Sequence, residues 1–133
     1  MTNTTIQSKR FNLVTLRQSD VSDRYLRWIN SSNNKYIDYT SQSRSLADIQ
    51  SYVAEREDDS TILFLGIFIR ESNEHIGNIK FEPINFHNKT AVMGILIGEE
   101  GWRGRGVALE VIKSSSEWLN KQYDINRIAL GVD

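Results

Sequence analysis

The stretch GILIGEEGWRGRGVALEVI, residues 94–112, decides how the rest of the chain is interpreted. It joins an apolar run to an apolar helical pattern through a short segment with four glycines and two arginines. Gly104 and Gly106 allow unusual backbone dihedrals and a close approach to a ligand. A helix start leaves N–H groups unpaired and carries the positive end of the helix dipole, and Arg103 and Arg105 add charge there. The stretch therefore predicts a site for a phosphate or pyrophosphate group.

Two common phosphate loops do not fit this stretch. A Walker loop needs Gly-Lys followed by Ser or Thr, which the segment lacks. A dinucleotide fingerprint needs a third glycine where this chain has Leu109, and it belongs at the start of a βαβ unit. A solvent-exposed helix start would explain the glycines, but it would not explain arginines beside a dipole that repels them.

Hydrophobic periodicity predicts the order of elements around the loop. Apolar alternation or short apolar runs indicate strands, and apolar residues at helical spacing indicate helices. The expected elements are a strand in residues 10–17, helices in 19–30 and 45–58, strands in 61–70, 75–84 and 90–98, a helix in 107–122 and a strand in 126–133. The order β-α-α-β-β-β-α-β predicts an α/β fold with a mixed, mostly antiparallel sheet flanked by helices.

Local signals set some of these boundaries. Ser19 or Asp20 is the expected N-cap of the first helix, and Ser45 with Asp48 resembles a capping box at the start of the second. Pro83 is expected to limit the strand that begins at residue 75, because proline cannot donate a ladder hydrogen bond.

Composition bounds the class of protein. At 133 residues the chain, residues 1–133, is expected to form one domain, and its net charge of -1 gives no basic face for nucleic acid. It has no cysteine, and its longest apolar run, residues 62–69, is far shorter than the ~20 residues of a membrane helix. We expect a cytoplasmic protein without nucleic-acid or membrane partners. His75 and His87 fall at predicted turns, where we expect them to be solvated and not to bind a metal.

The loop at residues 103–108 resembles the Arg/Gln-x-x-Gly-x-Gly/Ala loop of the GNAT acetyltransferases. The order of elements along residues 10–132 is similar to that family too. The resemblance implies that consecutive backbone N–H groups of the loop hold the pyrophosphate of acetyl-CoA. It also implies that the strand before the loop diverges from its parallel neighbour and pairs with the pantetheine arm. The cofactor-binding residues implied in this way are Ile95, Leu96, Ile97, Arg103, Gly104, Arg105, Gly106, Val107 and Ala108.

The reaction that the resemblance implies is direct attack of a primary amine on the thioester of acetyl-CoA. A free backbone N–H in residues 95–97 is the expected donor to the oxyanion, and a base must take the amine proton. Glu82 is the candidate base, although a surface glutamate paired with a lysine fits the same position. Tyr36 and Tyr39 lie in a polar loop that borders the acceptor cleft in this family, and they are the candidate acceptor-binding residues.

The chain departs from the family pattern at its C-terminal side. It ends at Asp133, directly after the strand that follows the cofactor helix, whereas family members continue with another helix and two strands. The last strand would then present an unpaired apolar edge, and we expect homo-oligomers formed through it.

The acceptor is left open between an amino sugar and a peptide N-terminus. The phrase HIGNIKFEPIN, residues 75–85, looks most like the branch that includes ribosomal-protein N-terminal acetyltransferases and amino-sugar acetyltransferases. The alternative function is a non-catalytic module of the same fold that binds CoA or oligomerises. Turnover with an amine separates the two.

Overall fold

The sheet at the centre of the protein has six strands, which lie side by side in the order of the sequence. The computed structural model describes residues 3–30 and 44–131. The strands are β1 (Thr5–Gln7), β2 (Phe11–Thr15), β3 (Leu63–Ile69), β4 (His75–Asn85), β5 (Thr90–Ile97) and β6 (Arg127–Leu130). All neighbouring strands are antiparallel except β5 and β6, which are parallel. The predicted mixed, mostly antiparallel sheet is confirmed.

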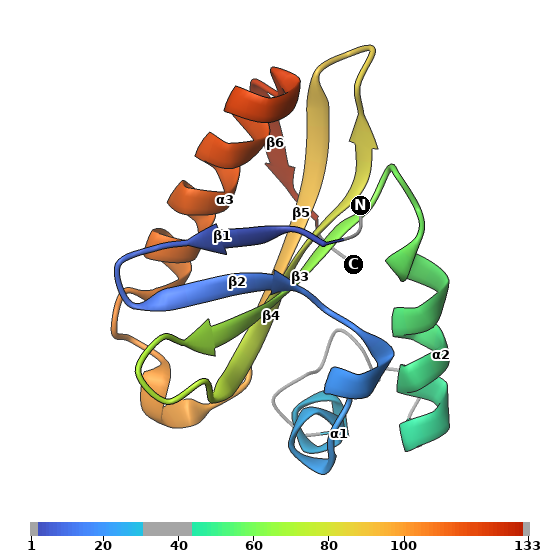
Figure 1. Ribbon diagram of the computed structural model, residues 1–133, viewed down its shortest axis with the longest axis vertical. Helices are drawn as coiled ribbons and strands as arrows, with labels where there is room; N and C mark the ends of the chain where they lie inside the picture. Colours follow the sequence, from blue (N-terminus) through green and yellow to red (C-terminus); the bar gives the residue numbers. More distant parts are fainter. Residues whose placement is uncertain (1–2, 31–43, 132–133) are drawn as a thin grey trace.

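Helices cover both faces of this sheet (Figure 1). They are α1 (Asp23–Asn30), α2 (Leu46–Glu57) and α3 (Val107–Tyr123), with short 3-10 turns η1 (Gln18–Asp20) and η2 (Glu100–Trp102). Helix α3 lies on one side of the sheet, whereas α1 and α2 lie on the other. The predicted order of elements is confirmed, and β1 precedes it.

Two hydrophobic clusters hold the helices to the sheet. Along β3, Leu65 and Ile67 belong to the cluster under α3, whereas Phe64 belongs to the cluster under α1 and α2. Because successive strand side chains point to opposite faces, an apolar run such as that of β3 serves both clusters. Val111 and Leu119 close the first cluster from α3, and both are fully buried.

Two boundaries near the N-terminus were not predicted. Strand β1 has only one buried residue, Ile6, so its pairing with β2 and not its own pattern makes it a strand. Helix α1 begins at Asp23, because the Ser22 hydroxyl accepts a hydrogen bond from the Tyr25 N–H at 3.2 Å. The expected cap at Ser19 or Asp20 was therefore wrong, and Asp20 instead accepts from the backbone N–H of Arg17 at 2.8 Å.

The expected strand end at Pro83 was also wrong. Strand β4 continues to Asn85 because the pairing with β5 shifts register between Phe81 and Ile84, which accommodates the proline in a bulge. The Ile84 N–H donates to the backbone oxygen of Thr61 at 2.7 Å. By contrast, the predicted capping box at the start of α2 is confirmed: the Asp48 N–H donates to the Ser45 hydroxyl at 3.1 Å.

Strand β6 pairs with only the first half of β5. The last pair is Met93 with Leu130, and the Gly131 N–H donates to the Met93 carbonyl at 2.7 Å. Beyond that point residues 94–97 still pair with β4, but no strand of the described residues pairs with them on the β6 side. Because strand backbone groups alternate in direction, Ile95 presents its N–H and C=O groups to the same side as Met93. The sheet is therefore open along one edge of β5.

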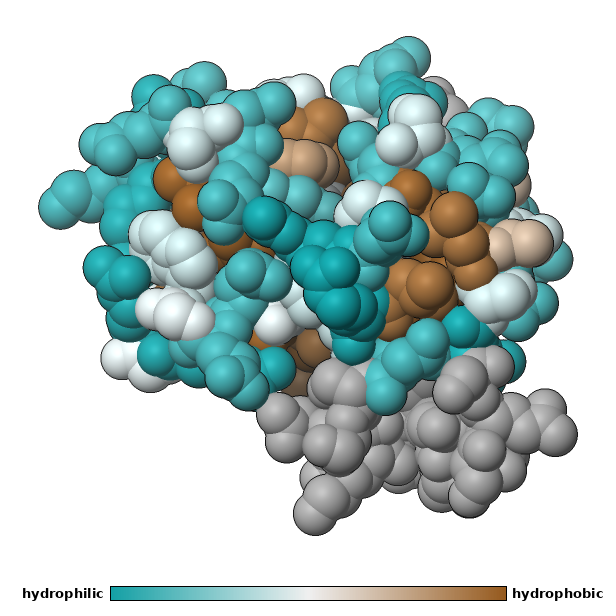
Figure 2. Space-filling model, turned by 90° about the horizontal axis from the view of Figure 1, so that it is seen from below, coloured by the Kyte–Doolittle hydropathy of each residue, from teal (hydrophilic) through white to brown (hydrophobic). Residues whose placement is uncertain are grey.

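The outer surface is mostly hydrophilic on the face seen from below. Hydrophobic side chains show there in separate patches between hydrophilic ones (Figure 2). Leu109 and Leu130 are the most exposed large hydrophobic residues among those described, at 76% and 63%. Within residues 3–30 and 44–131, no helix is long and apolar enough to cross a membrane.

Candidate active site

The loop before α3 has the backbone that its glycines suggested. Gly104 and Gly106 have φ angles of +74° and +76°, in the left-handed region that side chains with a Cβ rarely adopt. The first hydrogen bond of α3 runs from the Glu110 N–H to the Gly106 carbonyl at 3.1 Å. The N–H groups of the three residues before Glu110 therefore have no acceptor inside the helix and can bind an anion.

Both arginines of the loop are held close to it. Arg103 donates from Nε to the Ile97 carbonyl at 3.1 Å. Arg105 donates from Nη1 to the Gly101 carbonyl at 3.4 Å, and its guanidinium lies 4.5 Å from the centre of the Trp102 ring. Both side chains are exposed, so their remaining N–H groups can reach a bound anion.

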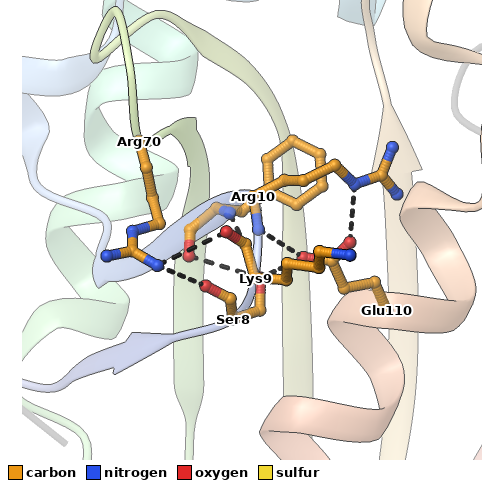
Figure 3. A network of polar contacts seen from close by, with 6 residues as sticks. Ser8, Lys9, Arg10, Arg70 and Glu110 are labelled. Carbon is orange, nitrogen blue, oxygen red and sulfur yellow. Dashed lines mark hydrogen bonds and ion pairs between the residues drawn. The ribbon is translucent and has the colours of Figure 1, made fainter.

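Glu110, in the first turn of α3, links the helix to the turn between β1 and β2 (Figure 3). Its carboxylate accepts from the Ser8 hydroxyl at 2.5 Å, from the Arg10 N–H at 2.8 Å and from Arg10 Nε at 2.7 Å. Burial raises the pKa of Glu110, but the hydrogen bonds from Ser8 and Arg10 together outweigh burial and hold this pKa below its ordinary value. Sequence reasoning missed this carboxylate, although an acidic residue in a first helical turn is a recognised signal.

Arg10 brings a third guanidinium to the loop. Its Nη2 lies 3.7 Å from the position that a Cβ on Gly106 would take. Arg70 supports the same turn, because its Nη1 donates to the carbonyls of Ser8 and Lys9 at 3.1 and 3.3 Å (Figure 3). Arg10, Arg103 and Arg105 therefore surround the start of α3 with positive charge, which suits a pyrophosphate.

A cavity of about 300 Å³ lies on the other face of β5, under α1 and α2. Its walls are mainly aromatic and aliphatic, with four polar side chains among them. The lining residues are Tyr25, Ile29, Arg44, Asp48, Ile49, Tyr52, Phe64, Asn78, Lys80, Gly94, Ile95 and Leu96. Of these, sequence reasoning had singled out only Ile95 and Leu96 as site residues.

Glu82 lies on β4, two residues beyond Lys80, and it is not part of the cavity wall. Its Oε1 is 2.9 Å from Arg56 Nε and 3.5 Å from Lys80 Nζ. Lys80 also donates to the hydroxyl of Tyr52, and both of these residues line the cavity. The side chain of Lys80 thus lies between the carboxylate of Glu82 and the cavity.

The candidate acceptor residues Tyr36 and Tyr39 lie outside the described residues. On either side of that segment, the Asn30 side chain binds both backbone groups of Arg44, with distances of 3.0 and 2.8 Å. Arg44 lines the cavity, so the described end of this segment is at the cavity wall.

His75 was wrongly expected to be solvated. It begins β4, where its ring stacks on Phe68 at 4.8 Å and meets the edge of Trp28 at 4.9 Å. Its Nε2 is 2.8 Å from Oδ1 of Asn78, and burial lowers the pKa of His75. The described residues contain no group of three His, Cys, Asp or Glu side chains that could hold a metal ion.

The fold is that of an acetyltransferase domain. The family profile described as acetyltransferase (GNAT) domain matches residues 10–133, and the chain belongs to this family of enzymes. Comparison with curated protein sequences gives no match.

Solved structures of acetyltransferases share the fold at low sequence identity. A ribosomal-protein-serine acetyltransferase from Vibrio cholerae has 14% identity and a TM-score of 0.81, over 100% of this chain and 76% of that one. The microcin C7 self-immunity acetyltransferase, solved with acetyl-CoA and AMP, has 19% identity and a TM-score of 0.76, over 92% and 69%. A spermidine N-acetyltransferase chimera, built in part from the Vibrio cholerae enzyme, has 16% identity and a TM-score of 0.76, over 92% and 70%.

Proposed function

We propose that this enzyme transfers an acetyl group from acetyl-CoA to a primary amine by direct attack of the amine on the thioester. One observation carries the proposal: β5 joins the loop to the cavity. Its edge is open along residues 94–97 for the cofactor arm, while Gly94, Ile95 and Leu96 line the cavity on the face where an acceptor can approach.

The cofactor residues of the proposal follow the geometry of the loop and the strand. The N–H groups of Val107 and Ala108 would bind the pyrophosphate, with positive charge from Arg103 and Arg105 and the left-handed backbone of Gly104 and Gly106. Along β5, Ile95 and Ile97 present backbone groups to the open edge. Leu96 turns its backbone toward β4, so it would contribute through its side chain.

The chemistry needs an oxyanion donor and a base. The amine nitrogen forms a bond to the acetyl carbon, and an N–H of Ile95 or Ile97 at the open edge would meet the charge on the carbonyl oxygen. The C–S bond then breaks, and the thiolate leaves. Glu82 stays our candidate base, since Lys80 or water between Glu82 and the cavity could pass the amine proton. Glu82→Gln should then lower kcat while the acetyl-CoA dissociation constant stays unchanged, whereas a structural role would lower the free energy of unfolding and leave kcat unchanged.

The first experiment is calorimetric titration of acetyl-CoA, followed by thiol release with a panel of amines that includes amino sugars and short peptides. Binding in the micromolar range and turnover with an amine support the enzyme. Binding without turnover across the panel supports a non-catalytic CoA-binding module instead. Absence of binding contradicts the assignment of the loop.

Association of two copies through β6 is a second part of the proposal. Leu130 on this strand is 63% exposed, and no strand among the described residues pairs with the outer edge of β6. Sedimentation should show concentration-dependent dimers that Leu130→Lys weakens. A monomer at all concentrations would contradict this part and leave the enzymatic part intact.

A further inference from the structure

The cavity wall contains two buried polar side chains whose hydrogen-bonding capacity is not used up within the described part of the chain. Tyr25 and Asn78 are only 3% and 4% exposed, and both line the cavity. No described residue pairs with the Tyr25 hydroxyl or with the Asn78 amide NH₂ group. Neither group is enclosed by protein, because among the described residues the enclosed side-chain N or O atom without a partner is Asn12 Oδ1. The Tyr25 hydroxyl and the Asn78 NH₂ group therefore face the cavity, where a ligand can pair with them.

The orientation of Asn78 is fixed by its neighbour. Its Oδ1 is 2.8 Å from Nε2 of His75, and since an amide oxygen only accepts, the histidine N–H donates. The His75 ring cannot turn away easily, because it stacks on Phe68 and meets the edges of Trp28 and Tyr25 at 4.9 and 5.9 Å. Asn78 therefore presents its NH₂ group as a fixed donor.

Strand β5, which lies opposite Asn78, has a residue without a side chain at its open edge, Gly94. In the pairing of β4 with β5, Asn78 lies opposite Leu96 and Lys80 lies opposite Gly94, so all four share the cavity face. A Cβ built on Gly94 meets no atom within 4 Å, and the φ of Gly94 does not require glycine. The glycine leaves the backbone of β5 accessible from the cavity at the point where β6 departs.

Two other glycines, Gly77 on β4 and Gly98 just after β5, differ from Gly94 in this respect. A Cβ on Gly77 would lie 2.2 Å from the Leu96 carbonyl oxygen, and one on Gly98 would lie 2.0 Å from the Trp28 ring. Those positions are glycine because backbone or ring atoms fill the space. Gly94 has no such reason, so an open approach to β5 is the feature that glycine provides there.

The charges of the cavity disfavour a polyamine acceptor. Arg44 and Lys80 place two cations in the wall against one carboxylate, that of Asp48, so the net charge of the wall repels a further cation. A protonated polyamine also offers only N–H donors, which cannot pair with the NH₂ donor of Asn78. An amine that carries an oxygen on the neighbouring carbon offers an acceptor to Asn78 and to the Tyr25 hydroxyl.

We propose that the acceptor is a primary amine with a hydroxyl or carbonyl oxygen on the carbon next to the amine-bearing carbon. Asn78 and Tyr25 bind that oxygen, and the amine nitrogen reaches the open edge of β5 over Gly94. Amino sugars and peptide N-termini share this chemistry, whereas spermidine lacks it. The inference rests on the proposed function, because it assigns the acceptor of that reaction.

The test compares acceptors that differ in this oxygen. Thiol release is measured with glucosamine, with cyclohexylamine as the ring amine without hydroxyls, with serinamide and with spermidine, at saturating acetyl-CoA. We expect kcat/KM for glucosamine or serinamide to exceed that for cyclohexylamine and spermidine by about 10-fold or more. If glucosamine alone is a good substrate, the acceptor is an amino sugar. If serinamide alone is a good substrate, the acceptor is a peptide N-terminus.

Two variants assign the effect to the cavity. Asn78→Asp has the same shape and keeps an oxygen for His75 but loses the donor, so kcat/KM for the oxygen-bearing acceptor should fall by about 10–100-fold, with little change for cyclohexylamine. Gly94→Val fills the open space and should reduce transfer to every acceptor, while the acetyl-CoA dissociation constant changes less than about 3-fold. Gly101→Val is the matched control, because its Cβ also meets no atom within 4 Å and lies outside the cavity wall.

The outcomes separate this inference from the proposed function. Failure of acetyl-CoA to bind contradicts the proposed function. Transfer that prefers spermidine, or that Asn78→Asp reduces equally for glucosamine and cyclohexylamine, overturns the inference and leaves the function standing. Full transfer by Gly94→Val also overturns it, and because that position has room for a side chain, misfolding does not confuse the result. Binding without any transfer refutes both.

Discussion

The cofactor loop and the cavity meet on β5, yet they are built in opposite ways. The loop, residues 103–108, uses the backbone of consecutive residues, with two left-handed glycines and the unpaired N–H groups of α3. The cavity uses side chains from α1, α2, β3 and β4 and a bare glycine on β5. The difference teaches that changes in the loop should affect the cofactor with any acceptor, whereas changes in the cavity should affect the acceptor alone.

The largest effect that we expect is from Gly106→Val. A β-branched side chain disfavours the φ of +76° and would turn the first N–H groups of α3 away from the pyrophosphate. Loss of two charge-assisted hydrogen bonds should weaken acetyl-CoA binding by about 100-fold or more, measured by calorimetry. Gly101→Val, at a position without a positive φ, should bind normally. An unchanged dissociation constant in Gly106→Val would remove the loop from the cofactor site.

The next effect concerns the support of the loop. Glu110→Gln keeps the shape of the side chain but removes the charge that holds Arg10 and Ser8. Since the carboxylate is only 17% exposed, unfolding free energy in urea should fall by about 2 kcal/mol. Glu117→Gln on the same helix is the control, because Glu117 is exposed and has no ion pair among the described residues. Equal stability of the two variants would show that the network in Figure 3 contributes little.

The same comparison explains how much could be predicted from the sequence. The order of helices and strands could be predicted because each apolar stripe is a local pattern. The loop could be predicted because glycine is the residue that most readily adopts a positive φ, as Gly104 and Gly106 do. Strand β1 could not be predicted, because Ile6 is its only buried residue and pairing with β2 defines it.

The cavity could not be predicted because no local pattern encodes it. Asn78 and Tyr25 are 53 positions apart in sequence and line the same cavity only when α1 packs on the sheet. His75 follows a turn, where solvation is the usual expectation, yet α1 covers it with Trp28. One signal was present: Asn78 lies between Gly77 and Ile79 in residues 76–79 of β4, which are all buried, and an amide in such a stretch needs a partner.

A smaller effect should come from the exposed charge of the loop. Arg105→Gln removes one cation but leaves the backbone N–H groups in place, so acetyl-CoA binding should weaken by about 3–5-fold at low salt. At about 0.5 M salt the difference from the unmodified protein should nearly vanish, because exposed charges are screened. A loss as large as that of Gly106→Val would show that the side chains, and not the backbone, carry the recognition.

The smallest effect that we expect is a pH dependence of the unfolding free energy, which distinguishes the cavity from the loop. Burial, opposed by the hydrogen bond to Asn78 and by Asp20, lowers the pKa of His75 below its ordinary value of 6.5. The unfolded chain then takes up the proton first, so unfolding free energy falls as the pH drops below about 6.5 and levels off once the folded protein is also protonated. The pKa of Glu110 is held below its ordinary value of 4.5, so the stability that it contributes is present above that pH and is lost only in stronger acid. Urea unfolding between about pH 5 and 7 should therefore show a pH dependence that His75→Gln reduces and Glu110→Gln does not. The reverse result would place the pH-sensitive group at the loop instead of the cavity.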